Sequence, residues 1–486
     1  MKFWRATVLL LVAAFLLMAC DNNAAAPAAS TTPTKAASAA NTPMAPAAAT
    51  NTTMAAAPAV ATDTPAAAAA APKPTNTMGA LPTPNSASGV TTLWFHSGTG
   101  GEREALEASI KKFNASNSGT TIEAVQLPEG SYNDQVNAAA LANGLPCLLD
   151  FDGPNVYNYA WTGRLVALDS YVAADMKADF LPSIIRQGTY NNKLYSLGQF
   201  DSGLGIYGNK DLLTKAGVRI PTGVSDAWSS EEFNDALKKL KASGLAYPLD
   251  MKMDYGRGEW YTYGFSPILQ SFGGDLIDRS NYQKADGTIN SAASVKAMTW
   301  FQGLFKDGYV NRKPAGGTDF ADGKAALSYV GHWTYADYKK ALGDKLVVLP
   351  MPKFGGKAVT GQGSWNWGIT STCKDPAAAW KVMSFLLSDE EILRMTDANG
   401  APPARKSALS QSKLYGPGAP LQVFADQLNN SLSLERPVTP AYPAITAAFQ
   451  EATDNIVNGA DVKGALDKAA KKIDQDIQDN QGYPIK

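Results

Sequence analysis

The sequence is short of the residues on which most metal and acid-base sites depend. Its 486 residues include two histidines and three cysteines, so a site with several transition-metal ligands would need mostly carboxylates. It also lacks an excess of either charge, with 43 Lys and Arg against 44 Asp and Glu, and therefore has no basic field to attract nucleic acid. We expect no nucleic-acid partner, no metal, no cofactor and an uncharged ligand.

Recognisable catalytic motifs are missing as well. The sequence contains no G-x-S-x-G nucleophile elbow and no zinc-binding motif. A secreted glycoside hydrolase or lyase would need two carboxylates, and Asp150 and Asp152 invite that interpretation. We expect strand alternation to direct the two side chains apart, so that they do not converge on one bond. The prediction is a protein that is not an enzyme, with a glycoside-active enzyme, or a surface lectin or adhesin without a transport partner, as alternatives.

The first twenty residues have the three parts of an export signal. Lys2 and Arg5 precede an apolar run at residues 8–15, too short to span a membrane, and small residues follow. The run ends in Leu-Met-Ala-Cys20, which resembles the lipobox of bacterial lipoproteins and implies that Cys20 becomes a lipidated N-terminus. A secretory leader with an incidental cysteine is the alternative. We expect an extracytoplasmic, lipid-anchored protein, with inner or outer membrane left open.

Residues 21–90 consist almost wholly of Ala, Pro, Thr, Asn and Ser. Such a composition cannot bury enough apolar surface to offset the entropy cost of ordering. We expect a disordered tether that lets a folded domain stand off the membrane. Whether its threonines are glycosylated stays open.

From Thr91 onward, short apolar runs alternate with amphipathic helical patterns, which favours an α/β fold with mainly parallel sheets. Thr99 and Glu102 have capping-box spacing, which predicts a helix directly after a strand that ends at His96. Gly144 and Gly244 are expected to end two later helices. Strands are predicted at 93–96, 121–127, 146–151, 247–253, 325–330 and 345–351, and helices at 133–143, 229–243 and from 375. Ligands of open α/β sheets bind beyond the carboxyl ends of strands, where we therefore seek the site.

Several segments, in order, resemble the family 1 extracellular solute-binding proteins, relatives of the maltose-binding and glycerol-phosphate-binding proteins. They are 93–97 with 100–102, 207–213 with 216–217 and Pro221, Phe320 with 323–327 and 331–333, and the glycine-rich 361–365. Gly208 departs from the pattern, which more often has tyrosine there. The resemblance spans Thr91 to the C-terminus. It implies an α/β, two-lobed periplasmic-binding-protein fold (type II) with hinge crossings and an interlobe ligand cleft.

The resemblance also implies an organisation and a function. The N-lobe would hold 91–199 with 361–397, and the C-lobe 200–360 with 398–486. The chain would be the substrate-binding lipoprotein of an ABC importer, a monomer that captures a saccharide or polyol and delivers it to the transmembrane permease subunits. Monosaccharide, oligosaccharide, polyol and glycerophosphodiester all suit such a cleft.

A saccharide receptor needs aromatic platforms for ring faces and bidentate polar side chains for hydroxyls. Trp333 is the main platform candidate, since Gly331 leaves room beside it. The other candidates, some of them placed by the resemblance, are Asp152, Tyr132, Trp365, Trp260, Tyr255, His96, Glu102, Asp201, Ser202 and Arg436. Each has a structural alternative, such as a helix cap, a turn, a core contact or, for Arg436, a surface ion pair. An anionic ligand would require Arg436 or a lysine nearby.

Two cysteines remain after Cys20. Cys147 begins a predicted strand, and Cys373 ends the strand that the resemblance returns to the same lobe. If these strands are antiparallel neighbours, the two cysteines come together. In an oxidising compartment they would then form a disulfide, with two free thiols as the alternative.

Overall fold

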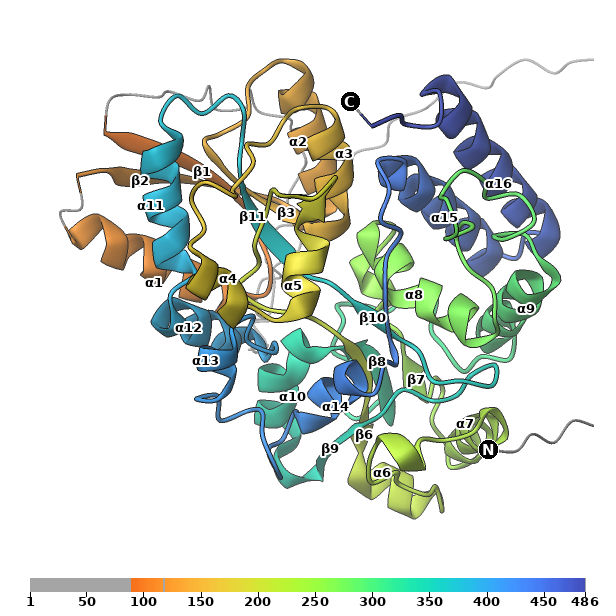
Figure 1. Ribbon diagram of the computed structural model, residues 1–486. Helices are drawn as coiled ribbons and strands as arrows, with labels where there is room; N and C mark the ends of the chain where they lie inside the picture. The colour runs from red at the N-terminus through yellow and green to blue at the C-terminus, as the bar shows by residue number, and fades with distance from the viewer. Residues whose placement is uncertain (1–88, 117–118, 486) are drawn as a thin grey trace, which may run out of the picture. The chain divides into compact units, whose positions relative to one another are not determined.

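The computed structural model describes residues 89–116 and 119–485 (Figure 1). The export leader, Cys20 and residues 21–88 of the tether lie outside these residues, so their roles stay predictions. Among the helices that are described, none combines the length and the apolar character needed to cross a membrane.

The first lobe is built on a four-stranded sheet in the order β11-β3-β1-β2. Three of its strands are parallel, β1 (Val90–His96), β2 (Thr121–Leu127) and β3 (Leu148–Asp152). The fourth, β11 (Trp365–Ile369), arrives from much later in the chain and is antiparallel to β3. The parallel strands end at the same edge of the sheet, which gathers the residues that follow them.

Different helices cover the two faces of this sheet (Figure 1). Successive side chains of a strand point to opposite faces. Leu93 and Phe95 therefore enter one core, with helices α1 (Gly100–Ala115), α11 (Pro376–Leu386) and α12 (Asp389–Asn399). Trp94 enters the other core, with α2 (Tyr132–Leu141) and α3 (Val156–Trp161). The lobe also includes α4 (Ala174–Asp179), α5 (Pro182–Gln187), α13 (Lys406–Leu409) and the hairpin of β4 (Thr189–Tyr190) and β5 (Lys193–Leu194).

The second lobe has a sheet in the order β7-β8-β6-β9, and the prediction of mainly parallel sheets is wrong for it. β6 (Leu204–Asn209) is antiparallel to both β8 (Leu327–Gly331) and β9 (Leu346–Leu349), and only β7 (Leu249–Asp250) pairs in parallel, with β8. β8, helix α10 (Tyr335–Leu342) and β9 form a βαβ unit with β6 inserted between its strands. The alternation of strands and helices reveals such a unit, but not the direction of the inserted strand.

The second lobe has one continuous hydrophobic core. Its residues come from two stretches of the chain, Leu204 to Ala358 and Tyr415 to Ile477. Its helices are α6 (Lys210–Lys215), α7 (Ser230–Ala242), α8 (Glu259–Ser271), α9 (Ala292–Lys306), α10, α14 (Gln422–Asn429), α15 (Tyr442–Val457) and α16 (Val462–Asp479). Two short parallel strands, β10 (Thr360–Gln362) and β12 (Ser433–Glu435), pair beside the segments that cross between the lobes. Packing against the first core continues past residue 397, through Ala401 and Ala404.

Helix ends show where local signals decided the fold. The predicted helix at 229–243 forms as α7, and it begins with a complete capping box, because Ser229 and Glu232 bond each other's backbone N–H groups. The prediction of a capping box at α1 is wrong, because Thr99 occupies the N-cap position but its side chain makes no capping hydrogen bond. The end of α2 differs too, since Asn143 and not Gly144 takes the left-handed conformation, with φ of 53°.

Cys147 precedes β3 and Cys373 follows β11, and the antiparallel pairing of these strands brings the two residues together. Their sulfurs are 2.17 Å apart and form a disulfide across 226 positions of sequence. The disulfide joins the early and the late segment of the chain that pair in the first sheet, β3 and β11.

Candidate functional site

A first aromatic group lies at the carboxyl ends of the strands of the first lobe. His96 ends β1 and stacks on Trp365, with ring centroids 3.5 Å apart and planes within 8°. Tyr132, at the start of α2, meets both rings edge-on, and its hydroxyl donates to the carbonyl oxygen of Asp150. His96 and Tyr132 are buried, whereas Trp365 is partly exposed. Trp365 is therefore the ring of this group that a solute can reach.

Carboxylates around His96 keep its imidazole protonated. Nδ1 forms an ion pair with Asp150, and Nε2 lies 3.8 Å from Oε1 of Glu102. Burial by itself would lower the pKa of His96, but the charges of Asp150, Glu129 and Glu102 outweigh it and raise the pKa from 6.5 to about 10. The ring stacked on Trp365 is thus a cation, which an indole face attracts.

A small cavity lies against this group. Its walls include His96, Glu102, Asp150 and Trp365, together with Phe200 from the first crossing segment. Glu102 also accepts a hydrogen bond of 3.3 Å from the side chain of Asn399, which explains why it does not cap α1. Among the described residues, no group of three or more His, Cys, Asp and Glu side chains is arranged to hold a metal ion.

A second aromatic group follows β8 in the second lobe. Trp333 donates from Nε1 to the hydroxyl of Tyr255 over 3.0 Å, and Trp260 meets the Trp333 ring edge-on at 6.0 Å. A Cβ atom at Gly331 would overlap the Trp333 ring, so the ring lies directly against the backbone there. Trp333 is partly exposed and Tyr255 is 41% exposed, while Trp260 is buried. Trp333 and Tyr255 offer the surface, and Trp260 supports it.

Asp152 and Arg436 lie together in a buried ion cluster. The guanidinium binds both carboxylate oxygens of Asp152 and also Oε1 of Glu259 at 2.8 Å, and it stacks over the Tyr263 ring at 4.9 Å. Arg436 is 6% exposed, so it does not form the surface ion pair considered as an alternative. Because Asp152 belongs to the first lobe and Glu259 to the second, Arg436 holds a carboxylate of each lobe.

Asp201 joins two crossing segments. Its carboxylate accepts from the backbone N–H of Ser202 at 2.8 Å, from the side chain of Gln362 at 3.2 Å and from the N–H of Gly363 at 3.4 Å. The residue is 1% exposed. These bonds match the turn-forming alternative and tie the first crossing to the segment that returns.

A hydrogen-bond chain with a fixed proton order extends from Ser202. The Ser202 hydroxyl lies 2.7 Å from the Tyr263 hydroxyl and 3.0 Å from Nε2 of His332, whose Nδ1 is 2.8 Å from the Asn399 carbonyl. That carbonyl can only accept, so Nδ1 carries the proton, Nε2 accepts from Ser202, and Ser202 accepts from Tyr263. The chain links a helix of each lobe to a crossing segment.

The model of the bacterial extracellular solute-binding protein family matches residues 108–415, more than half of the chain. The chain belongs to this family. Members of the family are binding proteins and not enzymes, and they act outside the cytoplasm. The resemblance found in the sequence is thereby confirmed.

Individual relatives of this solute-binding protein are distant. It is 25% identical over 233 residues to the maltodextrin-binding protein MdxE of Bacillus subtilis (strain 168), covering 46% of this chain and only 53% of that protein. It is 23% identical over 366 residues to the galactooligosaccharide-binding protein of the same organism, covering 72% and 81%. The solved GacH receptor of Streptomyces glaucescens GLA.O matches with a TM-score of 0.68 at 24% identity, over 81% of this chain and 99% of that one. This likeness confirms the predicted α/β, two-lobed fold.

The expectation that strand alternation separates Asp150 from Asp152 was wrong. Residues two apart lie on the same face of a strand. The two carboxylates are separated by their partners instead, because Asp150 pairs with His96 and Asp152 with Arg436.

Sequence reasoning missed several residues of this region of the solute-binding protein. Glu129 comes two residues after the carboxyl end of β2. Ligands of open α/β sheets bind beyond such strand ends, so the position of Glu129 in the sequence was a usable signal. His332 was visible only as part of the family pattern, and Glu259 and Tyr263 lie inside a helix with no local signal. Only the packing of the lobes reveals what these residues contact.

The two histidines of the solute-binding protein should titrate on opposite sides of neutrality. Burial lowers the pKa of His332 to about 4, whereas the pKa of His96 is about 10. The stabilising contribution of His96 is complete below pH 6.5 and is lost as pH rises through about 10. That of His332 is complete above pH 6.5 and is lost as pH falls through about 4. Since the chain has only two histidines, NMR titration of the ring protons should give two curves, which His96→Asn assigns. Two midpoints near 6.5 would contradict the electrostatics described here.

Proposed function

We propose that the chain is the solute-binding component of an ABC importer, which captures a saccharide and passes it unchanged to permease subunits. The observation that carries this proposal is the pair of aromatic groups, each with an accessible ring at the end of strands. Trp365 is that ring in the first lobe, and Trp333 and Tyr255 are those in the second. Aromatic faces pack against the weakly apolar faces of sugar rings. The named ligands of the relatives, maltodextrin and galactooligosaccharide, support the same class.

In this proposal the predicted site residues have different tasks. Trp333, Tyr255 and Trp365 contact the sugar. Tyr132, Trp260, His96 and Glu102 hold those rings, as their contacts indicate. Asp152, Arg436, Asp201 and Ser202 fix the crossing segments and do not contact the solute.

The proposal extends to the parts of the chain outside the described residues. Cys20 carries the lipid anchor, residues 21–90 are the tether, and the protein acts as a monomer at the outer face of a membrane.

The proposal also covers the boundaries between the lobes. The lobes divide close to residues 199 and 361 and a few residues after 397, since Ala404 still packs in the first core.

The alternative of a glycoside-active enzyme has less support. An acid and a base on either side of a glycosidic bond must be available to the substrate. Asp150 is committed to His96 and Asp152 to Arg436, and both are buried. We therefore propose that the protein catalyses no reaction.

Isothermal titration of the full-length protein with neutral mono- and oligosaccharides and polyols tests the proposed function. We expect at least one sugar to bind at micromolar concentration or below, with a negative heat-capacity change from burial of apolar surface. The sugar should be recovered intact by mass spectrometry after long incubation. Appearance of a cleaved product would favour the enzyme, and no binding by any solute would contradict a saccharide receptor.

A further inference from the structure

Lys252 is a buried lysine in a backbone conformation that rarely suits this residue. It is 4% exposed, and its φ is 52°, in the left-handed region that glycine and asparagine favour. A lysine in this conformation adds strain, and burial removes water from its ammonium. The side chain of Lys252 must therefore make contacts that offset both costs.

The ammonium of Lys252 joins three segments of the second lobe. Nζ donates to the carbonyl oxygen of Gly317 over 2.6 Å, and it lies 3.6 Å from Oδ2 of Asp250 and 4.0 Å from Oδ1 of Asp254. Asp250 ends β7, Asp254 lies in the 3-10 turn that follows, and Gly317 belongs to the loop between α9 and β8. This loop comes so close because residue 317 is a glycine: its φ is 70°, and a Cβ atom there would overlap the Asp254 carboxylate.

Tyr255 of the second aromatic group lies against this ammonium. The 3-10 turn Met253–Tyr255 begins directly after Lys252, and the N–H of Tyr255 donates to the Lys252 carbonyl over 3.1 Å. Nζ of Lys252 lies 5.5 Å from the centre of the Tyr255 ring, within the range of a cation–π contact. The turn has three residues, and the chain leaves it through Gly256 with φ of 72°. The Tyr255 ring therefore depends on its own side-chain contacts for a fixed position.

The position of Tyr255 in turn affects that of Trp333. The Tyr255 hydroxyl accepts the hydrogen bond of 3.0 Å from Nε1 of Trp333, and the Tyr255 ring meets Trp260 edge-on at 5.6 Å. Tyr255 and Trp333 are the accessible rings of this group, whereas Lys252 is buried. Lys252 thus lies behind the surface that is offered to the solute.

We propose that Lys252 is the positioning residue of the second aromatic group: its ammonium fixes the Tyr255 ring, and the Tyr255 hydroxyl then fixes the indole of Trp333. This inference rests on the proposed function and deepens it, because it names the residue that prepares the aromatic surface before a solute arrives. Rings that are already fixed lose less conformational entropy on binding than mobile rings do.

The test is a double-mutant cycle between Lys252→Met and Tyr255→Ala in the full-length protein. Methionine keeps most of the stem and removes the ammonium. With the sugar that binds wild type, isothermal titration should show about a tenfold loss of affinity in Lys252→Met. In a Tyr255→Ala background the same substitution should change affinity less than about threefold, because the ring it acts through is gone. A lysine that served only to neutralise Asp250 and Asp254 would have the same effect in both backgrounds.

Trp333 gives a second measurement that needs no solute. Its indole N–H resonance, identified by its absence in Trp333→Phe, reports the hydrogen bond to Tyr255 in NMR spectra of ¹⁵N-labelled protein. Tyr255→Phe removes the acceptor of this bond and shows the shift that its loss produces. Lys252→Met should shift the resonance in the same direction, because the acceptor is no longer held in place.

Lys241 provides the matched control. Its Nζ also donates to a glycine carbonyl, that of Gly308 at 2.8 Å, and lies 5.9 Å from the centre of a tyrosine ring, that of Tyr309. Lys241 is exposed, and Tyr309 does not belong to the second aromatic group. Lys241→Met should bind sugar as wild type does and leave the Trp333 resonance unchanged.

The outcomes separate the two proposals. If no sugar binds wild type, the saccharide function fails, and the Trp333 resonance still decides whether Lys252 positions the rings. If a sugar binds, an unchanged affinity or resonance in Lys252→Met, or an equal loss of affinity with and without Tyr255, overturns the role of Lys252 alone. If Lys252→Met does not fold because Asp250 is left buried without its cation, Lys252→Met combined with Asp250→Asn takes its place. Asp250→Asn alone is then the reference for both measurements.

Discussion

Replacement of Arg436 with methionine is expected to lower the free energy of unfolding by about 3 to 5 kcal/mol, the range for removing one partner of a buried ion cluster. Methionine keeps much of the side-chain volume but leaves Asp152 and Glu259 without their cation. Burial already raises the pKa of Glu259, and the charge of Arg436 opposes that rise. In the variant the Glu259 carboxyl would be driven further toward the neutral form, so part of the lost stability should return at acidic pH. Urea unfolding at pH 7 and pH 5 measures both effects.

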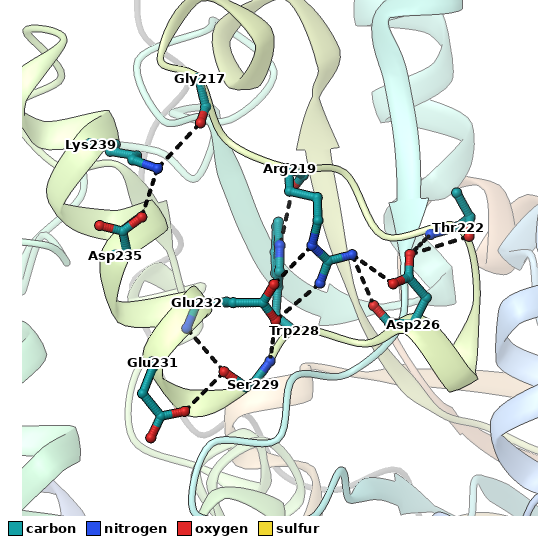
Figure 2. Close-up of polar contacts among 10 residues, drawn as sticks. All are labelled: Gly217, Arg219, Thr222, Asp226, Trp228, Ser229, Glu231, Glu232, Asp235 and Lys239. Atoms are coloured by element: carbon teal, nitrogen blue, oxygen red, sulfur yellow. Dashed lines mark hydrogen bonds and ion pairs between the residues drawn. The ribbon is translucent and has the colours of Figure 1, made fainter.

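Arg219 provides the matched control for this experiment. It also binds two carboxylates, those of Asp226 and Glu232, but at the surface of the second lobe (Figure 2). Its side chain is 41% exposed, against 5% for Arg436. Exposed ion pairs contribute little to the free energy of unfolding, because water and salt screen their charges and the two side chains lose conformational entropy when they pair. Arg219→Met should therefore change stability far less than Arg436→Met. Equal losses in the two variants would show that burial of the cluster is not what makes Arg436 important.

Substitution of Trp333 by alanine should reduce sugar affinity by about 2 kcal/mol or more, roughly 30-fold, as removal of a central aromatic contact commonly does. The ring is partly exposed, so the loss of stability should be smaller than for a buried tryptophan such as Trp260. Isothermal titration with the sugar that binds wild type measures the change. An unchanged affinity would remove Trp333 from the site.

Two further variants show whether the position of the Trp333 ring matters. In Gly331→Ala the new Cβ would overlap the ring and force it to move, so affinity should fall although the tryptophan is still present. Trp380 is also partly exposed, but it packs against Tyr171 in the first lobe, so Trp380→Ala should bind sugar as wild type does. A similar loss in Trp380→Ala would mean that the effect of Trp333→Ala is general destabilisation.

Much of the first lobe could be predicted from local pattern. β2 was predicted with its exact ends and β1 with its correct carboxyl end, because apolar alternation defines these strands. The extent of β7 could not be predicted: the apolar stretch 247–253 forms only a two-residue strand, after which Lys252 takes a left-handed conformation that ends the pattern. The strands predicted at 325–330 and 345–351 were also shorter or shifted by one or two residues.

Among the candidate site residues, the aromatic ones were easier to interpret than the charged ones. Gly331 beside Trp333 is a local signal, and the structure places the ring against that glycine. Arg436 and Asp152 are 284 positions apart, and nothing near either residue indicates that they bind each other. Charged residues depend on partners, which the sequence does not place.

The sequence by itself determined the export signal pattern, the class of fold, the family and the aromatic character of the site, because these follow from composition, periodicity and short motifs. The tertiary structure alone decided the direction of β6 and the commitment of Asp152, Arg436 and Asp201 to the crossing segments. The physical reason is that charge and hydrogen bonding are properties of pairs, and the pairs here join residues from different lobes and distant parts of the chain.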